Sequence, residues 1–117
     1  MKKTYNGSCH CGAVAFTVEG DAPDKAMSCN CSHCRRKGFL LTFVPAGQFT
    51  LDQGEDSLVT YTFNTHKLQH RFCGTCGTQA FAEGEQKGQA MRAINLRCVP
   101  SVDPEALTIQ KVDGASH

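Results

Sequence analysis

The residues with the clearest chemical potential in this 117-residue chain are its cysteines, because seven of the eight lie in three short groups. The first and last groups are called the outer pairs here, and the middle group is called the trio. The outer pairs are Cys9 with Cys11 and Cys73 with Cys76, and the trio is Cys29, Cys31 and Cys34. Sulfurs around a tetrahedral zinc ion lie about 3.7 Å apart, given a Zn–S distance of about 2.3 Å. Such short spacings bring sulfurs together without long-range folding, so the three groups predict metal binding.

The number of cysteines in each group predicts two kinds of site. Four thiolates complete the coordination of a structural zinc ion, whereas three leave one position open for chemistry. The outer pairs supply four cysteines, and the trio stands apart. We therefore expect two zinc ions per chain, one in a closed structural site and one in an open site. Thiolate ligands also suit iron, so the spacing alone does not identify the metal.

A short internal repeat supports the pairing of the two outer groups. The segment Cys11-Gly-Ala-Val-Ala-Phe16 resembles Cys76-Gly-Thr-Gln-Ala-Phe81, with Ala and Phe at the same distances from the cysteine. In each copy a glycine follows the cysteine and permits the positive φ with which backbone N–H groups can turn toward a sulfur. We expect two similar cysteine turns, each at the start of a strand, to meet at one ion.

The fourth ligand of the trio decides whether the second site is open, and the sequence leaves it undetermined. Water or a substrate thiol could occupy the position. The side chains that could close it are His33, His66, His70 and Cys98. Cys98 is also typical of a small buried residue at a strand end, which is the usual environment of a free cysteine.

Cations near the trio suggest how a substrate would be recognised. The basic run 35–37 follows Cys34 directly, and Arg97, with Asn95, could face the open site as well. Such a run is commonly a solvated face that balances the charge of the thiolates. The functional alternative is the binding of carboxylates on an anionic thiol. Arg35 and Arg97 are therefore the candidate substrate-binding residues.

The elements that must position these residues are predicted to be short strands. Residues 14–18 alternate Val and Phe with smaller side chains, as in a half-buried strand. Further strands are expected over 26–28, 39–44, 48–51, 58–63, 68–72, 79–82, 90–96 and 108–112. We also expect a helical turn over 32–37, a polar loop over 83–89 and a short helix start at Asp103-Pro104. Strands at this frequency predict an all-β fold.

The length and net charge of the chain limit its number of domains and the kinds of partner that we expect. The chain fits a single domain, residues 1–117. It has no apolar run long enough to span a membrane and no apolar signal region, so we expect a cytoplasmic protein, where disulfides are disfavoured. The formal net charge of +1 would become about −2 with seven thiolates and two zinc ions, so a nucleic-acid partner is not expected. The sequence indicates no oligomeric state.

Four motifs resemble those of the glutathione-dependent formaldehyde-activating enzyme family, which also includes the centromere protein V domain. They are Gly7-Ser-Cys-His-Cys-Gly12, Cys29-Asn-Cys-Ser-His-Cys-Arg35, Phe72-Cys-Gly-Thr-Cys-Gly77 and Ile94-Asn-Leu-Arg-Cys98. The resemblance implies a β-tent-like fold of small antiparallel sheets held by a four-cysteine zinc site. It also implies that the outer pairs bind structural zinc and that the trio binds catalytic zinc.

The activity implied by the resemblance is the addition of glutathione to formaldehyde, which is a carbon–sulfur lyase reaction in the reverse direction. We therefore hypothesise a zinc-dependent enzyme that joins glutathione or a similar small thiol to formaldehyde or another small aldehyde. The chain is shorter than the founding enzymes and has no Trp. We expect the zinc chemistry to carry over better than the specificity for glutathione.

Two other functions fit parts of the pattern. A non-catalytic, zinc-stabilised binding module would have a protein side chain as the fourth ligand of the second metal. A redox protein could use Cys73 and Cys76, but a thioredoxin-like motif expects a following helix. Residues 77–81 instead have the pattern of a strand, which makes the redox function the weaker alternative.

Overall fold

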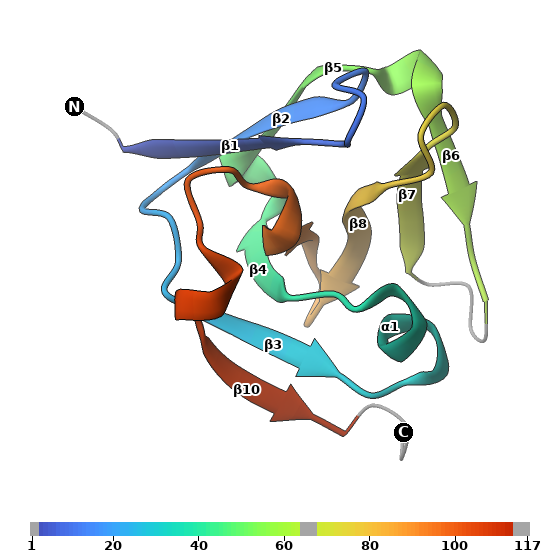
Figure 1. The fold of residues 1–117 in the computed structure, drawn as a ribbon. Coiled ribbons are helices and arrows are strands. Elements are labelled where there is room, and N and C mark those ends of the chain that lie inside the picture. Colours follow the sequence, from blue (N-terminus) through green and yellow to red (C-terminus); the bar gives the residue numbers. More distant parts are fainter. Residues whose placement is uncertain (1–2, 64–67, 114–117) are drawn as a thin grey trace.

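Two β-sheets and one short helix make up the fold in the computed structural model, which describes residues 3–63 and 68–113 (Figure 1). The first sheet has three strands in the order β1-β2-β5, and the second has seven in the order β10-β3-β4-β9-β8-β7-β6. The prediction of an all-β fold of small sheets is confirmed. No helix in these two ranges is both long enough and apolar enough to cross a membrane.

The elements follow one another closely along the chain. The strands are β1 (Thr4–Ser8), β2 (Ala15–Glu19), β3 (Lys25–Cys29), β4 (Leu41–Pro45), β5 (Phe49–Gln53), β6 (Leu58–Tyr61), β7 (Gln69–Cys73), β8 (Gln79–Gln86), β9 (Gln89–Asn95) and β10 (Thr108–Val112). The helix is α1 (Ser32–Lys37), and the 3₁₀ turns are η1 (Ala46–Gln48), η2 (Glu55–Ser57), η3 (Leu96–Cys98) and η4 (Pro104–Ala106). The predicted strands are present, with the ends of 108–112 as expected and those of the others shifted, and β1 was not predicted.

The predicted polar loop over 83–89 is wrong. Strand β8 continues to Gln86 and β9 begins at Gln89, so only Lys87 and Gly88 form the turn. Both turn residues have a positive φ, 51° and 80°, as two-residue hairpins of type I′ require. The polar side chains of residues 83–89 therefore belong to a hairpin rather than a loop. Glu83, for example, forms ion pairs across the sheet with Arg71 on β7 and Arg92 on β9.

One strand pair departs from the antiparallel pattern that the family resemblance implied. Strand β10 runs parallel to β3, from Thr108 opposite Lys25 to Val112 opposite Cys29. The other neighbour of β3 is β4, and they share one paired position, Met27 with Leu41. The strand that ends at the first cysteine of the trio is therefore paired mainly with β10, and the two run side by side in Figure 1.

The core packs around the two aromatic residues of the internal repeat. Phe16 and Phe81 are fully buried, and their ring centroids lie 6.4 Å apart in an edge contact. Phe49 stacks on Phe16 at 5.3 Å and lies 4.7 Å from Phe81. Burial of side chains this large contributes about 1.5–3 kcal/mol each. This packing fixes the two strands that begin just after the cysteine turns.

Gly7 in β1 permits a close approach between elements. A Cβ atom there would lie 2.6 Å from Cζ of Phe16 and 2.7 Å from the backbone oxygen of Cys98. No side chain fits at such distances. The absence of a side chain thus lets η3, which contains Arg97, lie against β1.

Candidate metal centres

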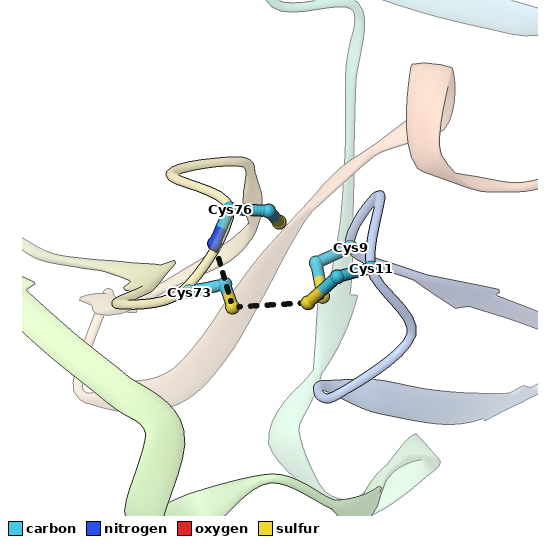
Figure 2. Close-up of side chains that lie close together, drawn as sticks. All are labelled: Cys9, Cys11, Cys73 and Cys76. Carbon is cyan, nitrogen blue, oxygen red and sulfur yellow. Dashed lines mark hydrogen bonds between the residues drawn. The ribbon is translucent and has the colours of Figure 1, made fainter.

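The outer pairs form a compact four-sulfur cluster. All four sulfurs lie within 4.8 Å of one another. Cys9 Sγ is 3.7 Å from Cys11 Sγ, which is 3.7 Å from Cys73 Sγ. These separations equal the edge of a sulfur tetrahedron around zinc, about 3.7 Å. Figure 2 shows the sulfurs of the two turns converging from opposite sides, so the donor set fits a metal ion.

The two cysteine turns have corresponding backbone hydrogen bonds, although the bond of the glycine spans three residues in the first turn and four in the second. In each turn the N–H of the first cysteine donates to the carbonyl five residues later at 3.0 Å. The Gly12 N–H donates to the Cys9 carbonyl (3.3 Å), and the Gly77 N–H donates to the Cys73 carbonyl (2.8 Å). Both glycines have a positive φ, 83° and 80°, which side chains disfavour. The repeat in the sequence is therefore a repeat in local structure.

Backbone N–H groups surround the sulfurs at the base of each turn. The Val14 N–H donates to Cys9 Sγ at 3.3 Å. The N–H groups of Thr75 and Cys76 donate to Cys73 Sγ at 3.3 and 3.5 Å. The Cys76 N–H is the main reason that the pKa of Cys73 lies below its usual value. Such donors stabilise a thiolate, which is the form that binds metal.

The thiols of the remaining two cysteines, Cys11 and Cys76, have pKa values shifted in opposite directions. The N–H groups of Cys11 and then Thr78 lower the pKa of Cys76 to about 5. At Cys11 the Ala13 N–H also favours the thiolate, but burial and the neighbouring sulfurs outweigh it and raise the pKa to about 11. Four adjacent thiolates repel one another, and a divalent cation at their centre would remove that repulsion.

The trio forms a second cluster where β3 passes into α1. The sulfurs of Cys29, Cys31 and Cys34 lie within 4.8 Å of one another. Cys31 is the N-cap of the helix, because its sulfur accepts the Cys34 N–H at 3.3 Å, as a Ser or Asp oxygen commonly does. Gly38, with φ 69°, ends the helix and donates its N–H to the Cys34 carbonyl. The predicted helical turn is confirmed.

The trio by itself does not favour three thiolates. Burial raises the pKa of the Cys34 thiol, and the adjacent sulfurs of Cys31 and Cys29 raise it further. Burial acts in the same direction on Cys31, but the Cys34 N–H and the neighbouring sulfurs leave its pKa below the usual value. Full deprotonation of the cluster would therefore accompany the binding of a cation.

No fourth Cys, His, Asp or Glu joins the trio among residues 3–63 and 68–113. His33 and His70 pack on each other, with ring centroids 4.0 Å apart. Burial is the main cause that lowers both pKa values, that of His70 to about 4. Cys98 donates to the Gln79 carbonyl at 3.8 Å, and burial is the main cause that raises its pKa to about 11. His66 lies outside the described residues.

A pocket of about 450 Å³ opens beside the trio. Its lining includes Cys29, Cys34 and three cationic side chains, Arg35, Arg97 and Lys111. Arg97 is held in place because its Nε donates to the Gly38 carbonyl at 2.7 Å. Cations so placed suit the carboxylates of a small ligand.

Lys111 is a lining residue that sequence reasoning missed. The parallel pairing of β10 with β3 places Lys111 opposite Ser28, beside the trio. Asp113 also lines the pocket, and its carboxylate accepts a hydrogen bond from Asn30 Nδ2 at 2.9 Å. No local pattern indicated that the strand over 108–112 lies next to β3, so the sequence carried no signal for these contacts.

The three cationic side chains of the basic run 35–37 do not all face the pocket. Arg35 lines the pocket beside the trio. Arg36 instead donates to the Ser32 carbonyl at 2.8 Å, and Lys37 Nζ lies 5.3 Å from the ring centre of Phe72. The latter two contacts are typical of cations in the last turn of a helix and on its flank. Of the run, Arg35 is thus the residue best placed to contact a ligand in this pocket.

A family model described as glutathione-dependent formaldehyde-activating enzyme matches residues 4–110. The chain belongs to this family. The crystal structure of a Rhodobacter sphaeroides protein is similar to this formaldehyde-activating family member, with a TM-score of 0.78 and 28% sequence identity. The match covers 90% of this chain and 99% of that one. Membership confirms the resemblance drawn from the cysteine motifs.

Proposed function

We propose that this family member is a zinc-dependent enzyme that adds glutathione or a similar small thiol to formaldehyde or another small aldehyde, or catalyses the reverse reaction. The observation that carries the proposal is the trio. Its three sulfurs gather without a fourth Cys, His, Asp or Glu from the described residues, beside a pocket lined by cations. The family's description supports the choice of substrates.

The cysteines would divide the two metal ions between a structural and a catalytic role. Cys9, Cys11, Cys73 and Cys76 would hold structural zinc, and Cys29, Cys31 and Cys34 would hold catalytic zinc. Zinc bound at the trio would lower the pKa of a thiol at its open position and so favour the nucleophilic thiolate.

The reaction needs no oxidant or reductant. The thiol sulfur forms a bond to the aldehyde carbon, the carbonyl π electrons move to oxygen, and the thiol proton ends on that oxygen. The product is a hemithioacetal. Because this addition is intrinsically easy, the contribution of the protein lies in positioning. Arg35, Arg97 and Lys111 would hold the carboxylates of an anionic thiol and direct its sulfur toward the trio.

Proton-exchange NMR on a mixture of formaldehyde and glutathione tests the proposal. We expect the zinc-loaded protein to accelerate exchange between free formaldehyde and its glutathione adduct, and Cys34→Ser to remove the acceleration. Cys98→Ser is the matched control, because Cys98 belongs to neither cluster. An exchange rate unchanged by the wild-type protein would refute the glutathione reaction and favour a non-catalytic binding module.

A further inference from the structure

The helix that carries Cys34 has little packing of its own. Helix α1 has six residues, and none of them is fully buried. A helix of this length is not stable alone in water, so contacts elsewhere must hold it. The ring contacts come mainly from His33, which lies between two trio cysteines, and Lys37 adds its contact with the Phe72 ring. The His33 ring centroid is 4.0 Å from His70, 5.2 Å from Phe63, 5.6 Å from Tyr61 and 5.7 Å from Phe39.

His70 is the nearest of these rings and is firmly fixed in the second sheet. It is 5% exposed and lies opposite Tyr61 in the β6–β7 register. Its Nδ1 is hydrogen-bonded to the side-chain amide of Gln79 at 3.0 Å. The backbone carbonyl of Gln79 in turn accepts the side-chain N–H of Asn95 at 2.9 Å. His70 is therefore a rigid surface against which the helix can rest.

His70 and Gln79 also flank the second cysteine turn. His70 precedes Cys73 in β7, and Gln79 begins β8 just after that turn. The turn is closed by the hydrogen bond from the Cys73 N–H to the Thr78 carbonyl. We therefore expect that an ordered second cysteine turn also positions His70 and Gln79, which lie before and after it.

We propose that His70 is a positioning residue for the trio: its tilted ring contact with His33 fixes α1 and relays the order of the four-cysteine cluster to the second metal site. This inference rests on the proposed function, because it requires the trio to bind a metal ion. His70 is not a ligand and does not touch substrate. It acts through the helix.

The contact between the two rings is packing rather than hydrogen bonding. His33 Nδ1 and His70 Nε2 are both buried and have no hydrogen-bond partner. A phenyl ring at position 70 should therefore preserve the contact with His33 although it loses the hydrogen bond to Gln79, whereas a methyl group should lose both. Comparison of His70→Phe with His70→Ala therefore separates a positioning role of the ring from a requirement for the imidazole nitrogens.

Metal binding, rather than activity, provides the test. The protein is loaded with Co(II), whose thiolate charge-transfer absorption reports both sites, and a chelator then competes for the metal. The Cys31→Ser variant supplies the spectrum of the four-cysteine site alone. We expect His70→Ala to weaken Co(II) binding at the trio by about 10- to 100-fold, as loss of supporting residues around metal ligands typically does. The four-cysteine site should keep its affinity, and His70→Phe should bind Co(II) at the trio more tightly than His70→Ala.

Phe43→Ala is the matched control. Phe43 is an aromatic residue on the same sheet, its side chain is 41% exposed, and within the described residues it makes no ring contact with His33. Equal trio affinity in His70→Ala and Phe43→Ala would overturn the inference, as would equal weakening of both metal sites. Should His70→Ala not fold, His33→Ala removes the same contact from the helix side. A wild-type protein that binds only one Co(II) ion would instead refute the proposed function.

Discussion

Arg35 and Arg36 are adjacent residues with the same charge and different surroundings. Arg35 faces the pocket beside the trio, whereas the Arg36 guanidinium is bonded to the carbonyl of Ser32 in its own helix. At the scale of single residues, recognition of a substrate is therefore expected to depend on which side of α1 a cation occupies, rather than on the total charge of the run.

Replacement of these two arginines tests that expectation. Arg35→Gln should raise the KM for glutathione by about tenfold, because it removes one charge-assisted contact to a carboxylate at a partly solvated site. Arg36→Gln should leave KM close to that of the wild type. Exchange rates measured over a range of glutathione concentrations give both values. A similar change in KM for the two variants would mean that the run acts only through its overall charge.

The residues that could be predicted from the sequence are those whose partners are close in the chain. Spacing alone grouped the trio, and the repeat around Gly12 and Gly77 paired the outer cysteines. Lys111 was not predicted as part of the site, and His70 was predicted only as a possible fourth ligand of the trio, because a parallel strand pair and a tilted ring contact bring them there. Such contacts depend on the tertiary fold and leave no local pattern.

At the scale of elements, glycines decide where the chain can turn and how closely two elements can approach. The outer part of the β8–β9 hairpin, residues 83–89, was predicted as a loop because it is polar, although Lys87 and Gly88 turn the chain within two residues. Gly7, in contrast, lies inside β1 and forms no turn. It is required because Phe16 and the Cys98 carbonyl lie too close to leave room for a side chain.

Gly7→Ala should destabilise the fold by about 1–3 kcal/mol, because the added methyl group would overlap the Phe16 ring and the Cys98 carbonyl. Gly47→Ala is the matched control, because a Cβ atom at Gly47 meets nothing within 4 Å and its φ is not positive. Denaturant unfolding of the zinc-loaded variants measures both effects. Equal stability of the two variants would show that β1 can move away from η3 without cost.

At the scale of the whole molecule, the four-cysteine cluster joins the two sheets. Its first turn leads into β2 of the three-stranded sheet, and its second turn links β7 and β8 of the seven-stranded sheet (Figures 1 and 2). The trio lies within one sheet and one helix. Loss of metal at the two clusters should therefore have unequal consequences.

We expect Cys73→Ser to unfold the chain, because a structural zinc site contributes folding free energy directly. Cys31→Ser should remove one zinc ion and leave the fold largely intact. Circular dichroism melting curves and zinc content per chain measure the two effects, with Cys98→Ser retaining both ions as the control. Equal destabilisation by Cys73→Ser and Cys31→Ser would contradict the proposed division between structural and catalytic metal.

The parallel pairing of β10 with β3 has a consequence for biosynthesis. Chains emerge from the ribosome from the N-terminus onward, so both cysteine turns of the outer pairs are complete once residue 78 has been made. Strand β3 must wait for its five-residue partner until residue 112 has been made. The nascent chain could thus bind a metal ion at the four-cysteine cluster while the strand beneath the trio still lacks its main partner, and we expect the trio to be ordered later.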